Sequence, residues 1–90
     1  MQKGGSGDAL AFVASSSVRA RIIAVLSGIP RTPTEVARLE NKHVSHVSRA
    51  IHELEHRGLV EFVNSESRRR YYRTTSQGMA LALILARGIR

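Results

Sequence analysis

The sequence predicts a mainly α-helical (α+β) fold in which a β-hairpin separates the last helix from four earlier ones. Apolar residues recur at helical spacing along much of the chain, and several of these stretches begin at residues that can cap a helix. Two short β-prone stretches with a polar tip between them follow the fourth predicted helix. Ninety residues give room for one domain with one modest core, so a cleft enzyme is not expected.

The first predicted helix follows a short leading segment. Residues 1–7 are polar and glycine-rich, which predicts a flexible lead before a domain that spans residues 8–90. Asp8 can cap a helix that runs through Ser15, with apolar residues on one stripe.

The second predicted helix begins after a run of serines. Ser16 or Ser17 can act as its N-cap, and Gly28 marks its end. Its apolar residues recur at helical spacing and are expected to be core: Val18, Ile22, Val25, Leu26 and Ile29.

The tetrapeptide TPTE has the pattern of a helix start. Thr32 fits the N-cap, Pro33 the first helical position, and Glu35 the position that completes a capping box. This helix is expected to end near Glu40, because Asn41 can take the left-handed conformation that terminates a helix.

A second helix of the same motif is expected directly after this tight turn, and the pair spans about residues 33–57. Gly58 is expected to end it. Its apolar stripe consists of Val44, Val47, Ile51 and Leu54.

The hairpin is predicted for about residues 59–74, with Leu59 to Val63 as one strand, NSESRR as a polar tip and YYRT as the other strand. Because side chains alternate across a strand, one of Tyr71 and Tyr72 should be buried and the other partly exposed.

The last helix is predicted for about residues 76–87. Either Thr74 with Gln77, or Thr75 one residue later, can cap it. Its sequence GMALALILARG is apolar almost all round, so we expect it to be a dimerisation helix that packs against a second copy with help from the first helix. The alternative is that its leucines pack within one chain. The predicted interface consists of Leu10, Phe12, Val13, Met79, Leu81, Leu83, Ile84 and Leu85.

The charge balance favours a polyanionic partner. Fourteen Lys and Arg against seven Asp and Glu give a formal net charge of +7, which favours nucleic acid over an anionic membrane. The chain has no cysteine, which excludes disulfides, thiolate metal sites and cysteine nucleophiles. Its longest apolar run is far shorter than the ~20 residues that span a bilayer. We therefore expect a cytoplasmic, nucleoid-associated protein.

Two segments, TPTEVARLENKHVSHVSRAIHELEHRGLVEF and RRRYYRTTSQG, resemble the winged helix-turn-helix of MarR-like and ArsR-like transcription regulators. The resemblance covers roughly residues 16–78. It implies a homodimer that binds double-stranded DNA and regulates transcription without catalysis or a cofactor. The chain departs from the pattern at His43, where the family has a small capping residue, and in lacking the cysteines of metal-sensing members.

Within this resemblance, the second helix of the motif is the recognition helix. Its outer face fits the major groove, which is ~12 Å wide and presents a distinct pattern for each base pair. Arg49 is the strongest candidate for reading a base, because its planar guanidinium can pair with guanine. The expected contacts from this element are Lys42, His43, Ser45, His46, Ser48, Arg49 and His52.

Two further elements are expected on the DNA backbone or in the adjacent minor groove. The hairpin, as a wing, brings four arginines, although such a charge run can also merely keep an edge strand soluble. Thr32 and Thr34 can donate to phosphate, although capping alone explains Thr32. The predicted wing contacts are Arg68, Arg69, Arg70 and Arg73.

HELEH, at residues 52–56, matches the HExxH signature of zinc metalloproteases. Stepping ~100° per residue from the apolar stripe places His52 and His56 on the solvent face, where the pattern lacks a third ligand and a cleft. We therefore expect no catalytic or metal-binding residue here. A regulatory metal site formed by His52, His56 and His46 is the alternative.

Two other functions remain open at this stage. An architectural or partition-type protein would coat duplex DNA through phosphate charge with little sequence preference. A protein-interaction module would keep the fold without binding DNA. The net charge argues against the second, and the polar recognition face favours sequence-specific binding. No small-molecule effector is identified.

Overall fold

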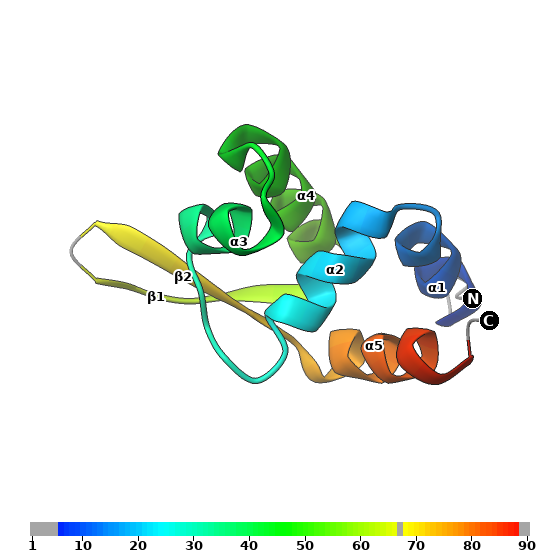
Figure 1. Cartoon of the computed structure of the whole chain (residues 1–90). Helices are drawn as coiled ribbons and strands as arrows, with labels where there is room; N and C mark the ends of the chain where they lie inside the picture. Colours follow the sequence, from blue (N-terminus) through cyan, green and yellow to red (C-terminus); the bar gives the residue numbers. More distant parts are fainter. Residues whose placement is uncertain (1–5, 67, 89–90) are drawn as a thin grey trace.

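The structure is a computed structural model that describes residues 6–66 and 68–88, and within them it confirms the mainly α fold class. The hairpin extends from one end of the molecule, and α1 and α5 lie at the other end (Figure 1). The elements are α1 (Ser6–Ala14), α2 (Ser17–Val25), α3 (Pro33–Glu40), α4 (Val44–His56), β1 (Val60–Glu66), β2 (Arg69–Thr74) and α5 (Ser76–Gly88).

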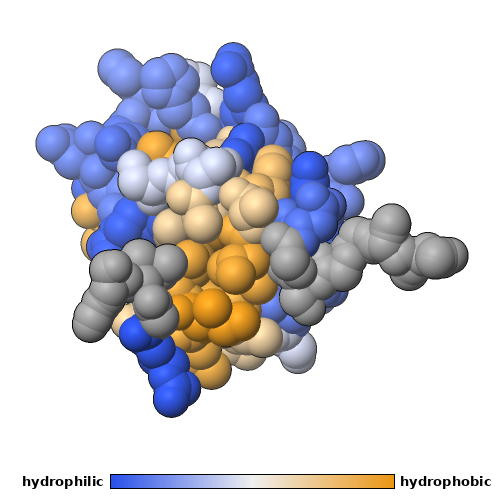
Figure 2. All heavy atoms as spheres, turned by 90° about the vertical axis from the view of Figure 1, so that its right-hand side faces the viewer, coloured by the Kyte–Doolittle hydropathy of each residue, from blue (hydrophilic) through white to orange (hydrophobic). Residues whose placement is uncertain are grey.

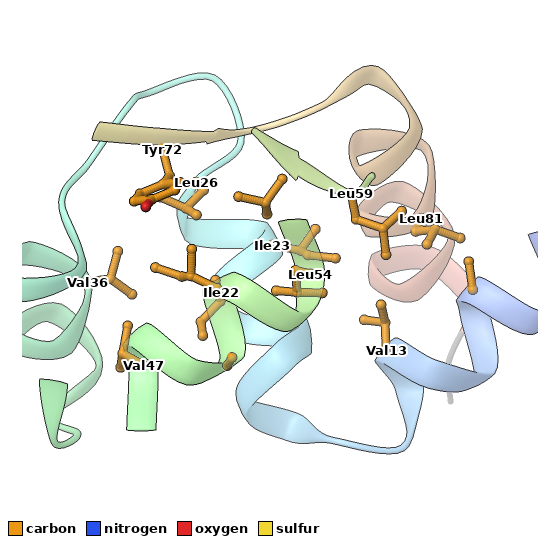
Figure 3. Packing of buried hydrophobic residues seen from close by; sticks show 14 of the residues in the cluster. Val13, Ile22, Ile23, Leu26, Val36, Val47, Leu54, Leu59, Tyr72 and Leu81 are labelled. Carbon is orange, nitrogen blue, oxygen red and sulfur yellow. The ribbon is translucent and has the colours of Figure 1, made fainter. Parts of the chain in front are cut away.

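The core is built around α2, which packs against α1, α3, α4 and α5 (Figure 3). Ile22 and Ile23 of α2 are fully buried, as are Val47 and Leu54 of α4. Tyr72 closes the core from the side of the hairpin. Every described element except the tip of the hairpin therefore depends on one shared apolar cluster.

Backbone hydrogen bonds join the hairpin to the segment after α2. Arg31 and Tyr72 exchange two bonds, of 3.0 and 2.9 Å, and the Thr74 N–H donates to the Leu26 carbonyl at 3.1 Å. The Thr74 hydroxyl donates to the Ile23 carbonyl at 2.8 Å. The two Thr74 bonds go to carbonyls at the end of α2, where the last turn of the helix has no further N–H to pair with them.

The two helices of the central motif begin and turn as predicted. The Thr32 oxygen accepts from the Glu35 N–H at 3.1 Å, and the Glu35 carboxylate accepts from the Thr32 N–H at 2.9 Å, which completes the capping box. Asn41 ends α3 in the left-handed region, with φ of 55°. Gly58, with φ of 77°, follows α4.

The start of α1 differs from the prediction. The helix begins at Ser6 and ends at Ala14, so Asp8 lies in its first turn instead of capping it. Residues 6 and 7 of the predicted lead therefore belong to α1, and residues 1–5 lie outside the described part of the chain. For α2, Ser16 is the cap, because its hydroxyl oxygen accepts from the Arg19 N–H at 3.2 Å.

Ile29, which was expected to be core, and Val44, which was assigned to an apolar stripe, are both exposed. Ile29 is 54% exposed because α2 ends at Val25, so helical periodicity no longer sets its direction. Gly28, with φ of 86°, lies in the loop beyond this end. Val44 is 46% exposed because the first turn of α4 extends past the core.

The hairpin is longer than its β-prone residues suggested. The antiparallel strands continue to the pair Glu66 and Arg69, so they include most of the predicted polar tip. Their register shifts at a bulge between Phe62 and Asn64. Tyr72 is buried and Tyr71 is half-buried, as alternation across the strand predicts.

Of the two predicted caps for the last helix, Thr75 is the one that the structure contains. Its hydroxyl oxygen accepts from the Gly78 N–H at 3.1 Å. Thr74 is instead buried, and its hydroxyl donates to the Ile23 carbonyl of α2.

We predict that Thr32→Ala lowers the free energy of unfolding by about 1 kcal/mol, because it removes the cap of α3. Thr32 is only 5% exposed, whereas Thr34, two residues later, is exposed. Thr34→Ala is therefore the matched control and should change stability by less than about 0.5 kcal/mol. Urea unfolding of the two variants measures the difference, and equal midpoints would contradict the role of the cap.

Candidate nucleic-acid interface

The outer face of α4 is polar and exposed, opposite the buried Val47, Ile51 and Leu54. The amphipathic pattern of the helix thus positions its polar residues as predicted. Ser48 is half-buried at the edge of the apolar stripe. The exposed members of the predicted recognition set are Lys42, His43, Ser45, His46, Arg49 and His52.

Residue His43 stands at the N-cap of α4 and makes no side-chain capping bond. Its ring instead meets the ring of His46 edge-on, with centroids 5.8 Å apart. The departure from a small capping residue therefore leaves an imidazole pair at the start of the helix. Arg49 lies one turn further along, on the exposed face.

Aromatic side chains connect α4 to the hairpin. Tyr72 meets His52 of α4 and Phe62 of β1 edge-on, with centroid distances of 6.3 and 5.9 Å. Arg70 covers the Phe62 ring at 4.3 Å, and its Nε donates to the Tyr72 hydroxyl oxygen at 3.2 Å. This hydrogen bond raises the pKa of Arg70 above its ordinary value. The guanidinium is thus fixed close to the recognition helix.

The other wing arginines have different surroundings. Arg68 and Arg69 are exposed near the tip, and Arg68 has a left-handed backbone with φ of 68°. Arg73 is exposed at the base of the hairpin, where it pairs with Glu61 at 2.9 Å. Its charge is therefore partly neutralised within the chain.

A pocket of about 550 Å³ lies between the start of α3, the outer face of α4 and the hairpin. Thr32 and Thr34 both line it, but the oxygen of Thr32 is occupied by the capping bond. Sequence reasoning missed Arg38, which also lines it, because nothing in the periodicity of α3 shows which face the hairpin covers. Other residues that line the pocket are Ser48, His52, Arg69 and Arg70.

A second, shallower groove of about 740 Å³ runs along α4 beside Phe12. Phe12 lies between two guanidinium groups, those of Arg19 at 3.8 Å and Arg57 at 3.9 Å. Arg19 also pairs with Glu53 of α4 at 3.2 Å. Phe12 therefore belongs to a contact between α1, α2 and α4. No spacing pattern indicates this contact, because it joins positions far apart in the chain.

Two residues of HELEH, His52 and Glu53, make contacts with other elements of the fold. His52 lies against Tyr72, and Glu53 pairs with Arg19. Among the described side chains, no group of three His, Cys, Asp or Glu could hold a metal ion.

Apolar residues gather on the face of α1 and α5, away from the hairpin (Figure 2). Leu83 is 63% exposed, and Ile84 and Met79 are also exposed. Two residues must be removed from the predicted interface, since Val13 and Leu81 are buried within the single chain. The half-buried members of that prediction are Leu10, Phe12 and Leu85.

None of the helices in residues 6–66 and 68–88 is both long enough and apolar enough to cross a membrane.

Sequence comparison finds neither a matching family model nor a matching curated protein. Solved structures do match. A mutant form of ZitR from Lactococcus lactis has a TM-score of 0.73 and 19% identity over 79% of this chain and 50% of its own. The adhesin competence repressor AdcR from Streptococcus pyogenes has a TM-score of 0.74 and 20% identity over 79% of this chain and 53% of its own.

A predicted DNA-binding transcriptional regulator from E. coli has a TM-score of 0.72 and 25% identity, over 89% of this chain and 82% of its own. The fold is a winged helix-turn-helix that resembles MarR-type regulators. In this fold α3 and α4 are the helix-turn-helix and the hairpin is the wing. The chain spans about half the length of the ZitR and AdcR chains that it matches.

We predict that purified protein, after dialysis, retains far less than one zinc per chain, because a stable site needs more ligands than HELEH supplies. Elemental analysis of the wild type and of His56→Ala gives the measurement. Stoichiometric zinc that is lost in His56→Ala would contradict the prediction and support the regulatory metal site.

Proposed function

We propose that the chain is a sequence-specific, double-stranded DNA-binding transcriptional regulator that acts as a homodimer and has no catalytic activity. The observation that carries the proposal is that the recognition helix and the arginine-bearing wing line the same basic pocket. The description of the E. coli structure as a predicted DNA-binding transcriptional regulator supports it. A nucleoid-associated, cytoplasmic location follows from the proposed partner.

In this proposal the exposed face of α4 enters the major groove. At ~1.5 Å per residue the helix is about 20 Å long, which is sufficient to cross the groove. Arg49 reads a guanine through O6 and N7, and Ser45 and His46 contact neighbouring bases. Lys42, His43, Ser48 and His52 contact the flanking phosphates or base edges.

The remaining contacts are to the sugar-phosphate backbone. Thr34 is exposed at the start of α3, where a hydroxyl can donate to phosphate, while Thr32 chiefly caps the helix. The wing arginines bind phosphates or enter the adjacent minor groove. Within the wing, we expect Arg68, Arg69 and Arg70 to contribute more to DNA binding than Arg73, because the charge of Arg73 is paired with Glu61.

We predict that Arg49→Ala reduces the ratio of operator affinity to random-duplex affinity by about 5- to 150-fold for each half-site of the operator, which corresponds to losing ~1 to 3 kcal/mol of base discrimination per half-site. Arg87→Ala removes the same charge from α5 and should leave the ratio unchanged. The operator is first obtained by selecting bound duplexes from a random pool at two salt concentrations. A pool that yields no preferred sequence would favour the architectural binder instead.

Dimerisation is proposed through the exposed apolar face of α1 and α5. Leu83, Ile84 and Met79 lie exposed on α5, and covering them removes apolar surface from water. A two-fold axis through this face leaves the wing and α4 of each copy directed outward. Recognition helices separated by ~34 Å, one turn of duplex, would require an inverted-repeat operator.

We predict that Leu83→Glu converts the dimer into a monomer, because it places a carboxylate in an apolar interface. Leu39→Glu is the matched control, since Leu39 is 55% exposed on α3, outside this face. Sedimentation equilibrium over a range of concentrations distinguishes the two states. A Leu83→Glu variant that remains as dimeric as the control would refute the proposed interface.

A further inference from the structure

We propose that the pocket between α3, α4 and the wing binds the phosphates of one DNA strand, and that Arg38 is a phosphate ligand in it. The inference rests on the proposed function and adds to it a single site with defined walls. The strand in question is the backbone that separates the major groove, occupied by α4, from the minor groove next to it.

The geometry of the duplex requires a strand at this place. Adjacent major and minor grooves share one sugar-phosphate backbone as their common border. If α4 lies in one groove and the wing tip in the other, that backbone must cross the space between them. The pocket of about 550 Å³ occupies this space, because α4 supplies Ser48 and His52 and the hairpin supplies Arg69 and Arg70.

Arg38 and Arg70 provide the charge on the two sides of the pocket. Among the side chains that the structure describes, no carboxylate lies within 4.0 Å of either guanidinium. Other arginines are used differently, since Arg19, Arg21 and Arg57 pair with acidic residues. The cations that face the pocket are thus available to an anion from solution.

The acidic residue that lines the pocket in the described part of the chain is Glu35. Its carboxylate accepts the Thr32 N–H at 2.9 Å, and the N-terminal turn of α3 offsets its charge. Thr34 and Ser48 add hydroxyl donors to the pocket wall. The balance of the lining groups therefore favours a phosphodiester, which offers acceptor oxygens and a negative charge.

One wall of the site is arranged before DNA binds. Arg70 stacks on the Phe62 ring and donates to the Tyr72 hydroxyl oxygen, so its guanidinium has little orientational freedom left to lose on binding. A group that is already oriented costs less conformational entropy on binding. Arg38 lies across the pocket on α3, a helix fixed by its capping box.

The test measures the salt dependence of operator binding for Arg38→Gln. Because each neutralised phosphate contributes ~0.9 to the slope of log K against log salt, and the proposed dimer carries two copies of Arg38, the slope should fall by about twice that amount. Arg87→Gln, which loses the same charge on α5, should keep the wild-type slope. Arg38→Lys retains a cation and should retain most of the slope, which separates loss of contact from loss of folding.

A second measurement locates the phosphate. Operators in which one phosphate at a time is replaced by an uncharged methylphosphonate should bind wild-type protein more weakly at one or two positions on the strand between the grooves. At those positions Arg38→Gln should show little further loss, because the variant and the modified DNA remove the same contact. Inorganic phosphate should compete only at concentrations far above those of the duplex.

Two results would overturn the inference while leaving the proposed function intact. The first is that Arg38→Gln binds the operator with the same slope of log K against log salt as Arg87→Gln. The second is that each methylphosphonate substitution lowers the affinity of the wild type and of Arg38→Gln by the same factor. Failure of the wild-type protein to bind any duplex would overturn both the inference and the proposed function. Strong competition by inorganic phosphate at low concentration would show a site for a free anion instead of a strand.

Discussion

The attachment of β2 to the end of α2 determines where the wing lies. The last turn of a helix leaves carbonyl groups without internal partners, and a buried carbonyl without a partner is costly. In this chain Thr74 donates to two of them, with its N–H to the Leu26 carbonyl and its hydroxyl to the Ile23 carbonyl, which also accepts from the Ser27 hydroxyl. Arg31 and Tyr72 extend the pairing by two more bonds. The base of the hairpin is therefore held against the helical core.

This attachment also links the wing to the recognition helix. Tyr72 is buried under the hairpin, and its ring contacts His52 of α4 and Phe62 of β1. Its hydroxyl oxygen accepts from Arg70, so a core residue orients a surface cation. The α4 and hairpin walls of the basic pocket therefore both contact the same buried aromatic side chain, Tyr72.

The exposed apolar face and the basic pocket lie at opposite ends of one small core. α5 packs against the exit of α4 so closely that a Cβ on Gly78 would overlap the Leu59 carbonyl oxygen. On the same side of the molecule, Arg19 and Arg57 enclose Phe12 and connect α1 to the outer side of α4. Because α1 and α5 both pack directly against α4 or its exit, a second copy bound at α5 would have a fixed orientation relative to the recognition helix.

The sequence by itself determined the features that local interactions decide. The capping box at Thr32, the left-handed Asn41, the polar face of α4 and the alternation of the two tyrosines each depend on neighbouring residues, so spacing alone predicted them. Only the tertiary structure decided which members of a predicted apolar stripe are covered by other elements. Helical periodicity predicts the direction in which a side chain points, but it does not predict whether another element covers that side chain. Val44 is therefore exposed although it lies on an apolar stripe, and Leu81 is buried within the chain although it was expected at an interface. The pocket depends on contacts between α3, α4 and β2, and for that reason Arg38 became visible as a site residue only in three dimensions.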